Sequence, residues 1–543
     1  MTPDMVLEQK MDREINLGPI LALEKQIEEH EGYGETIIQL KRTRNSLLNV
    51  SILLPPEILG SVFCWNVIPD GDFGGVPGGS YNFLLVCHHW FDVASCTPEL
   101  WSFWGNSIHD WTHRHTRCAT APVDLALEIS FTNDRLDDQL RDALQDHAAR
   151  DTIRRIHLRS IDANLLNPII SSMVTQGEET QAKRVESFII EDNKLWSPVD
   201  VSAFFSRYHL PKLRCLRLVG CRISSWDLLR SQTTVLTTLQ LTSDDSSSRP
   251  TLSQMLSILS SNPLLQHVRL SFSLDPRVVD GDTPPSKVRL RHLKHLYLAS
   301  DPRYTFQLLS LLELPDKMDN LDLFLDKSSP SGLSQMLGPY IGDHVQRRGR
   351  FPGGGLGLLV KHRSNTFTLS AGDTRIGGDP AKVVWFLKVS ATTDTQLEGK
   401  EADWLCFDLI AHIRREQVTR LETNLPILRW EELCVAMRNL THLHLTDVNL
   451  STWFAELAVC GPQASKELLR GLTHIVITRA TLRGGDWSPL TNFLSRRAAV
   501  GNRISSLRLT GHPYMEEGVV ESIKRVVEVF EDKSRGRAVT ASG

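Results

Sequence analysis

One spacing of apolar residues recurs through most of this 543-residue chain, from about residue 150 onward. Three apolar residues follow the form L-x-x-L-x-L, and the last two share one face of an extended strand. The first seven triplets begin 32, 28, 23, 29, 28 and 25 residues apart, and the last three begin 32 apart. The triplets are Ile153-Ile156-Leu158, Val185-Phe188-Ile190, Leu213-Leu216-Leu218, Leu236-Leu239-Leu241, Leu265-Val268-Leu270, Leu293-Leu296-Leu298, Met318-Leu321-Leu323, Leu440-Leu443-Leu445, Leu472-Ile475-Ile477 and Ile504-Leu507-Leu509. Ten triplets at related intervals are hard to obtain by chance.

A triplet of this form with a period in the twenties to low thirties is typical of leucine-rich repeats. Each repeat places a short strand beside the next and returns through a helix or loop, so the strands form a parallel sheet. We therefore expect an α/β fold class, with a leucine-rich-repeat-like solenoid over residues 151–530. Residues 330–410 are rich in glycine and break the rhythm. There, either the repeat continues with long excursions or a small β insertion interrupts it.

Two helical segments are expected ahead of the repeats. Residues 1–50 have apolar positions near heptad spacing, which predicts a coiled-coil-like helix that either self-associates or packs on its own domain. In residues 51–105, Pro55 and Pro56 stand where a helix should begin, with Glu57 in its first turn. A glycine-rich loop over 69–80 then leads to a second helix that ends before Pro98.

This second helical stretch, LLVCHHWFDVASCTPELW, contains two cysteines and two histidines. A helix turns about 100° per residue, so Cys87 and Cys96 point to opposite sides and the helix alone supplies at most one metal ligand. Neighbouring Cys87 and His88 also diverge, which disfavours a catalytic pair. The apolar side chains instead form one stripe, typical of packing: Phe83, Val86, Cys87, Trp90, Val93 and Ala94.

The apolar residues within residues 51–105 follow an order that resembles a known sequence pattern. It runs Leu54-Pro55-x-Glu57-Ile58-Leu59-x-x-Val62-Phe63, then after a loop Leu85-Val86-Cys87-x-x-Trp90-x-x-Val93-Ala94, and continues as Thr97-Pro98-Glu99-Leu100-Trp101-Ser102. This pattern resembles an F-box, and its continuation is similar to that of F-box-like proteins of basidiomycete fungi. Two features depart from the usual F-box: the loop at 66–82 is longer, and His88 and His89 stand where basic residues are common.

An F-box is a small all-helical module that docks on the adaptor Skp1, and leucine-rich repeats behind it commonly hold a substrate. The resemblance therefore implies a Skp1-like adaptor and, through it, a cullin as partners, together with an unknown protein substrate. The residues expected at the adaptor contact, some of which must instead form the core of the module, are Leu54, Pro55, Ile58, Leu59, Val62, Leu85, Val86, Trp90 and Val93.

The repeats would present a second surface. The residue between the last two apolar positions of each triplet points to the opposite, concave face of the sheet. The candidate substrate-binding residues on that face are Arg217, Arg269, Tyr297, His444 and Arg508. With few acids and several Arg and His at such positions, the face favours acidic partners, although an ordinary solvated face fits the same residues.

Composition argues against several other classes of function. The net charge of −4 gives no reason to expect nucleic acid, and no apolar run is long enough for a membrane span. Nine cysteines without a CxxC pair suit reduced thiols in a cytoplasmic and/or nuclear protein. No phosphate-binding loop or catalytic motif appears, so we expect no catalytic residues, no metal and no cofactor.

One cluster in the connector over residues 106–150 could hold zinc in principle. It consists of His109, His113, His115 and Cys118. Its polar surroundings and the nearby Pro122 favour a solvated linker instead. At the other end of the chain, we expect a disordered tail over residues 531–543.

These observations predict the substrate-recognition subunit of an SCF-type E3 ubiquitin ligase, with no active site of its own. The alternative is an F-box and repeat scaffold that acts outside any ligase. A third reading is a hydrolase or transferase with an unrecognised site.

Overall fold

The computed structural model describes residues 54–67, 84–104, 121–129, 152–160 and 163–174, most of 180–325, parts of 338–424 and most of 437–533, with short pieces within 22–43 and residue 117. The chain forms two compact units, Met1–Leu213 and Arg214–Gly543. The boundary falls inside the repeat region, a division that the triplet pattern did not predict. The described residues within 22–43 are helical, as expected for that segment.

The first unit opens with a helical module made of α4 (Pro56–Val67), α5 (His88–Ser95) and α6 (Pro98–Trp101). Helix α4 begins at Pro56 with Glu57 in its first turn, so this prediction is confirmed. Helix α5 is shorter than predicted, because Cys87 is extended (φ −161°, ψ 167°) and the helix begins only at His88. The apolar stripe derived for a helix starting near residue 83 was therefore wrong for Val86 and Cys87, which precede the helix.

A parallel sheet follows in the same unit. Its strands β1 (Phe103–Trp104), β2 (Val123–Ile129), β3 (Ile153–Ser160) and β5 (Ser187–Asp192) pair in that order. Strand β2 lies within 106–150, so treating that whole range as a connector was wrong. Its signal was present in the alternation of Val123, Leu125 and Leu127, all of which are buried.

The rest of the first unit consists of short elements around this sheet. Helices α9 (Ala163–Met173) and α10 (Ser202–Arg207) contact each other. The two-residue strands are β4 (Thr180–Gln181), β6 (Val199–Asp200) and β7 (Tyr208–His209).

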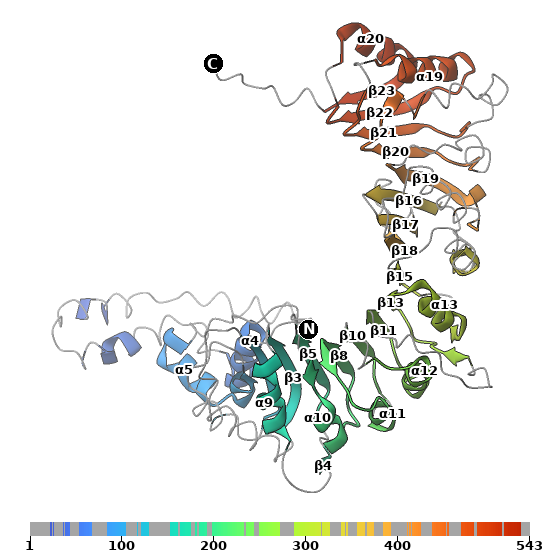
Figure 1. Ribbon diagram of the computed structural model, residues 1–543. Helices are drawn as coiled ribbons and strands as arrows, with labels where there is room; N and C mark the ends of the chain where they lie inside the picture. Colours follow the sequence, from blue (N-terminus) through green and yellow to red (C-terminus); the bar gives the residue numbers. More distant parts are fainter. Residues whose placement is uncertain are drawn as a thin grey trace, which may run out of the picture. The chain divides into compact units, whose positions relative to one another are not determined.

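The second unit contains a ladder of parallel strands. The strands β8 (Cys215–Val219), β10 (Thr238–Thr242), β11 (His267–Ser271), β13 (His295–Ser300) and β15 (Asn320–Leu325) pair in that order. The helices α11 (Asp227–Gln232), α12 (Leu252–Ser261) and α13 (Pro302–Ser310) contact one another in sequence and lie on one side of these strands (Figure 1). The short strand β9 (Cys221–Arg222) follows β8.

The apolar triplets explain this register. Leu216, Leu239, Val268, Leu296 and Leu321 lie directly opposite one another on neighbouring strands, and each is at most 2% exposed. All ten triplets coincide with strands, so the α/β class with a parallel sheet is confirmed. In several triplets the first residue closes a turn before its strand, as where the amide of Leu213 donates to the carbonyl of Leu210 at 3.1 Å.

The described part of the irregular region contains three long strands, β16 (Leu356–Arg363), β17 (Thr366–Asp373) and β18 (Val384–Thr392), after a few helical residues within 338–345. They pair antiparallel with each other in the order β18–β17–β16, while β18 is parallel to β15 and β16 is parallel to β19 (Val418–Thr423). A β insertion therefore interrupts the repeats, yet it is built into the same sheet.

The sheet continues beyond the insertion through β19, β20 (His442–Thr446), β21 (His474–Thr478), β22 (Ile504–Thr510) and β23 (Val527–Asp532), all parallel. The helical elements in the described residues of this part include the short η4 (Arg415–Gln417), α19 (Ser488–Ala499) and α20 (Glu517–Val526). Strand β23 reaches Asp532, so the expected tail was wrong in beginning at 531, and residues 534–543 lie outside the described part of the chain.

Candidate interaction surfaces

The helical module has an apolar core of its own. The rings of Phe63 and Trp90 lie 5.0 Å apart, and the indole nitrogen of Trp101 donates to the carbonyl of Ala94 at 2.8 Å. Leu59 is 2% and Val93 is 7% exposed. Of the nine residues predicted at the adaptor contact, Leu59, Trp90 and Val93 thus face the interior of the module.

The other predicted apolar contact residues face outward. Among the described residues, eleven large apolar side chains are exposed, and seven of these belong to the helical module. We call these seven the exposed apolar set: Leu54, Ile58, Val62, Trp65, Leu85, Val86 and Phe91. Exposed apolar side chains concentrated in one small region mark a candidate interaction surface.

Helix α4 explains how core and surface residues alternate. Ile58, Val62 and Trp65 are four and three residues apart, so they share one face of the helix. Leu59 and Phe63 lie about 100° further round and are buried. Trp65, which is 83% exposed, was missed in the sequence analysis although its helical spacing from Ile58 and Val62 could have indicated it.

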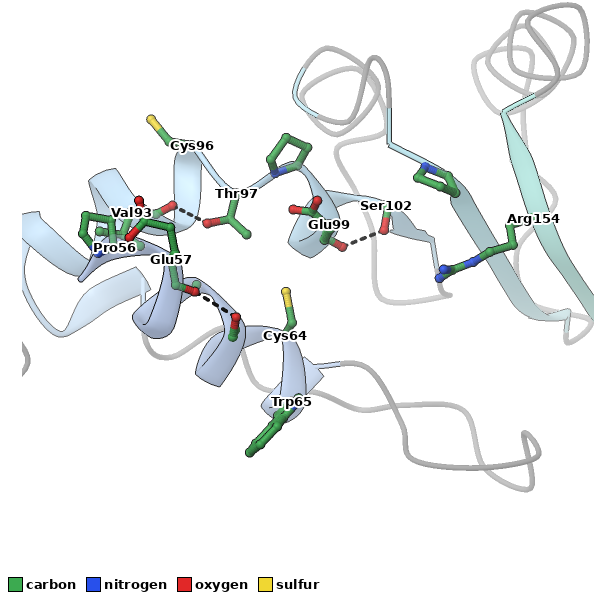
Figure 2. A pocket seen from close by; sticks show the side chains of 14 residues that line it. Pro56, Glu57, Cys64, Trp65, Val93, Cys96, Thr97, Glu99, Ser102 and Arg154 are labelled. Carbon is green, nitrogen blue, oxygen red and sulfur yellow. Dashed lines mark hydrogen bonds between the residues drawn. The ribbon is translucent and has the colours of Figure 1, made fainter. Parts of the chain in front are cut away.

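An open groove of about 770 Å³ lies between α4 and the segment that joins α5 to α6. Figure 2 shows Cys64 directed toward this groove and Arg154 on its far side, whereas Trp65 points away from Cys64. Burial, followed by the charge of Glu99, raises the pKa of the Cys64 thiol. A thiol held protonated is a poor nucleophile, which disfavours Cys64 as a catalytic nucleophile.

The side chains that border the groove are tied to nearby backbone or to the sheet. The hydroxyl of Thr97 donates to the carbonyl of Val93 at 2.7 Å, within the same turn. The guanidinium of Arg154 donates to the buried carboxylate of Asp124 at 2.9 Å, and this hydrogen bond raises the pKa of Arg154. These groups hold the groove in shape.

The two histidines that depart from the F-box pattern occupy the first turn of α5. The Nδ1 atom of His88 contacts the carboxylate of Asp92, one helical turn later, and both side chains are about half exposed. A position that is commonly basic in an F-box is therefore occupied here by a histidine next to an acid of its own helix.

The described residues contain no group of three or more His, Cys, Asp or Glu that could hold a metal ion. The cluster of His109, His113, His115 and Cys118 lies outside them. No helix in the described part of the chain has the length and apolar character needed to cross a membrane.

The predicted substrate-binding residues lie on the face of the strands opposite α11, α12 and α13, which we call the open face. Arg217, Gln240, Arg269 and Tyr297 form one row across β8, β10, β11 and β13. The guanidinium carbon of Arg269 lies 4.3 Å from the centre of the Tyr297 ring, a cation–π contact that fixes both side chains.

An acid continues this row. Asp322 on β15 lies opposite Tyr297, and partial burial raises the pKa of its carboxyl, against the opposing effects of Lys388, His295 and Arg269. The row therefore contains both signs of charge, rather than the purely basic surface suggested by Arg217 and Arg269.

His444 and Arg508 lie further along the same sheet and have acidic neighbours. The Nδ1 atom of His444 is 3.4 Å from the carboxylate of Glu422, and the guanidinium of Arg508 donates to Glu531 at 2.7 Å. The expectation of few acids was wrong here, because Glu422 and Glu531 lie on β19 and β23, which no triplet identified. Five strands separate Tyr297 from His444, so the five candidates form two groups and not one site.

Histidines stack in pairs on the open face. The rings of His267 and His295 are 4.6 Å apart, and those of His442 and His474 are 4.3 Å apart and nearly parallel. Burial, then the charges of His474 and Arg420, lowers the pKa of His442 to about 4. His442 is therefore neutral at pH 7.

No protein-family model matches the sequence, and no curated protein is found to be similar to it. Assignment of a function therefore depends on the residues and their geometry. Within the described residues, that geometry offers two surfaces suited to binding: the exposed apolar set and the open face.

Proposed function

We propose that this protein is the substrate-recognition subunit of an SCF-type ubiquitin ligase. Its F-box-like module docks on a Skp1-like adaptor, and its leucine-rich-repeat-like array holds a target protein. The reaction itself takes place on other subunits, so this chain contributes positioning: it raises the effective concentration of the target's lysines near the ubiquitin-charged enzyme.

The observation that carries the proposal is the division of roles within the F-box-like motif. Six of the nine motif residues assigned to the adaptor are exposed, five of them apolar and the sixth Pro55, while the other three pack inside. A module that needed its apolar residues only for folding would bury them, because leaving such side chains in water forgoes about 1.5–3 kcal/mol each.

The array supports the second half of the proposal. The triplets of the second unit place polar and aromatic side chains in rows on the open face. Repeat proteins use such sheet surfaces for recognition. The Arg217, Arg269 and Tyr297 row combines charge with an aromatic anchor, and these residue types dominate the binding energy of many interfaces.

The test is affinity purification of the intact chain with the proteasome blocked, followed by mass spectrometry. We expect Skp1 and a cullin together with one or more target proteins. The Arg217→Glu, Arg269→Glu, Tyr297→Ala variant should retain Skp1 and lose the targets. A matched control is Arg230→Glu, Arg303→Glu, Tyr304→Ala, which makes the same changes on α11 and α13 and should keep both.

Each outcome has a distinct meaning. Targets that remain on the open-face variant would contradict target capture by that face. Retention of a partner set without Skp1 or a cullin would favour the scaffold that acts outside a ligase.

A further inference from the structure

A strongly basic pocket lies on a separate two-stranded sheet of the second unit. This sheet pairs β12 (Val288–Arg289) with β14 (Leu312–Glu313). The pocket has a volume of about 530 Å³, and we call it the basic pocket. It is lined by Lys287, Arg289, Arg291, Leu312, Glu313, Leu314 and Pro315.

The local backbone directs the three cations to one side. Val288 and Leu290 are buried, and their amides donate to the carbonyls of Leu311 and Glu313 at 2.8 and 3.2 Å. Lys287, Arg289 and Arg291 alternate with these buried residues and are all exposed. Alternation along the extended segment places Lys287 and Arg289 on the same face, and Arg291, in the turn that follows, also lines the pocket.

The lining has an excess of positive charge. Glu313 is the single acid among the lining residues, and its carboxylate lies 3.6 Å from Arg289. Three cations less one carboxylate leave a charge of +2 on the lining, in a chain whose net charge is −4. Such a local reversal of sign attracts an anionic partner.

The wall of the pocket is apolar. Leu314 and Pro315 are partly exposed beside the cations, and Leu312 is buried beneath them. A ligand that fits this surface carries carboxylates next to an apolar group. Binding of nucleic acid would need an extended basic stripe. Three cations on one short segment do not form such a stripe.

We propose that the basic pocket binds an acidic peptide segment of a partner protein. Carboxylates of the peptide meet Lys287 and Arg291, and an apolar side chain packs on Leu314 and Pro315. This inference rests neither on adaptor docking nor on the open face, so it stands or falls separately from the proposed function.

The experiment measures fluorescence anisotropy of the intact chain with a labelled octapeptide of alternating Glu and Leu at low salt. The Lys287→Glu, Arg291→Glu variant should weaken binding about tenfold or more, and added salt should weaken binding to the unchanged protein, because exposed charges are screened. The matched control, Arg214→Glu, Arg222→Glu, changes the charge equally at two other exposed positions and should bind like the unchanged protein.

Three results would overturn the proposal: no binding of the octapeptide, equal loss in the variant and its control, or tighter binding of a labelled thymidine octanucleotide. Circular dichroism checks that the variant is folded. If it is not, Lys287→Gln, Arg291→Gln replaces it and should still weaken binding severalfold; unchanged binding by that variant would equally overturn the proposal.

Discussion

At Gly60, helix α4 packs closely against Thr97, in the segment between α5 and α6. A Cβ atom at this position would lie 2.8 Å from the hydroxyl oxygen of Thr97. That hydroxyl cannot turn away without losing its hydrogen bond to Val93. The packing of the helical module therefore depends on the absence of a side chain at residue 60.

We predict opposite effects of one substitution at two helical glycines. Gly60→Ala should destabilise the protein by about 1–2 kcal/mol through overpacking. Gly518→Ala in α20 meets no atom within 4 Å. It should stabilise by roughly 0.5–1 kcal/mol, since alanine loses less backbone entropy than glycine. Urea unfolding of both variants measures the difference, and a Gly60→Ala variant as stable as the parent would contradict the packing described here.

The burial of single residues could not be predicted from the sequence motif. Leu59 and Ile58 are adjacent, apolar and both part of the F-box-like motif, yet one is 2% and the other 51% exposed. A motif records which residue types occur and not which way each one faces. The buried Arg497 was not predictable either: it donates to the carbonyls of Leu469 and Leu472 at 2.9 and 2.8 Å, a long-range contact that no local pattern indicates.

Among the parallel strands, those with the full triplet were predicted from the sequence, and β19 was not. Two apolar residues separated by one residue predict a strand that is buried on one face. Strand β19 escaped because Thr423 takes the third triplet position, where it is fully buried. For β16, β17 and β18 the sequence left two alternatives open, a β insertion or continued repeats, because these strands pair antiparallel with each other, outside the repeat pattern.

The burial of His442, which stacks on His474 of the neighbouring strand, makes the stability of the protein depend on pH. With the pKa of His442 lowered from 6.5 to about 4, the unfolded chain binds a proton between these pH values that the folded chain does not. The stability that depends on this residue is thus present above pH 6.5 and is lost as the pH falls toward about 4.

We therefore predict that His442→Gln makes the protein less sensitive to acid. The fall in unfolding free energy between pH 7 and pH 5 should shrink by about 1 kcal/mol, a figure reduced for the partial exposure of the ring. Urea unfolding at both pH values measures it, with the exposed His292→Gln as control. An identical pH dependence in His442→Gln and the parent would rule out this role.

Across the whole molecule, two kinds of surface lie in different units. The exposed apolar set belongs to the first unit and the open face to the second. The sequence predicted both surfaces in outline, because each follows from a local spacing of residues. It did not predict which residues of each surface are available to a partner, since that depends on contacts between elements distant in sequence.

The most direct test of the proposed function is the dissociation constant of purified Skp1 for the intact chain, measured by isothermal titration calorimetry. We predict micromolar binding or tighter. Ile58→Asp, Val62→Asp should weaken it about a hundredfold while circular dichroism stays unchanged, because two exposed contact residues are replaced. Leu264→Asp, Val500→Asp alters two exposed apolar residues outside the module and should bind normally. A folded parent protein that does not bind Skp1, or a surface variant that binds as tightly as the parent, would contradict the proposed docking.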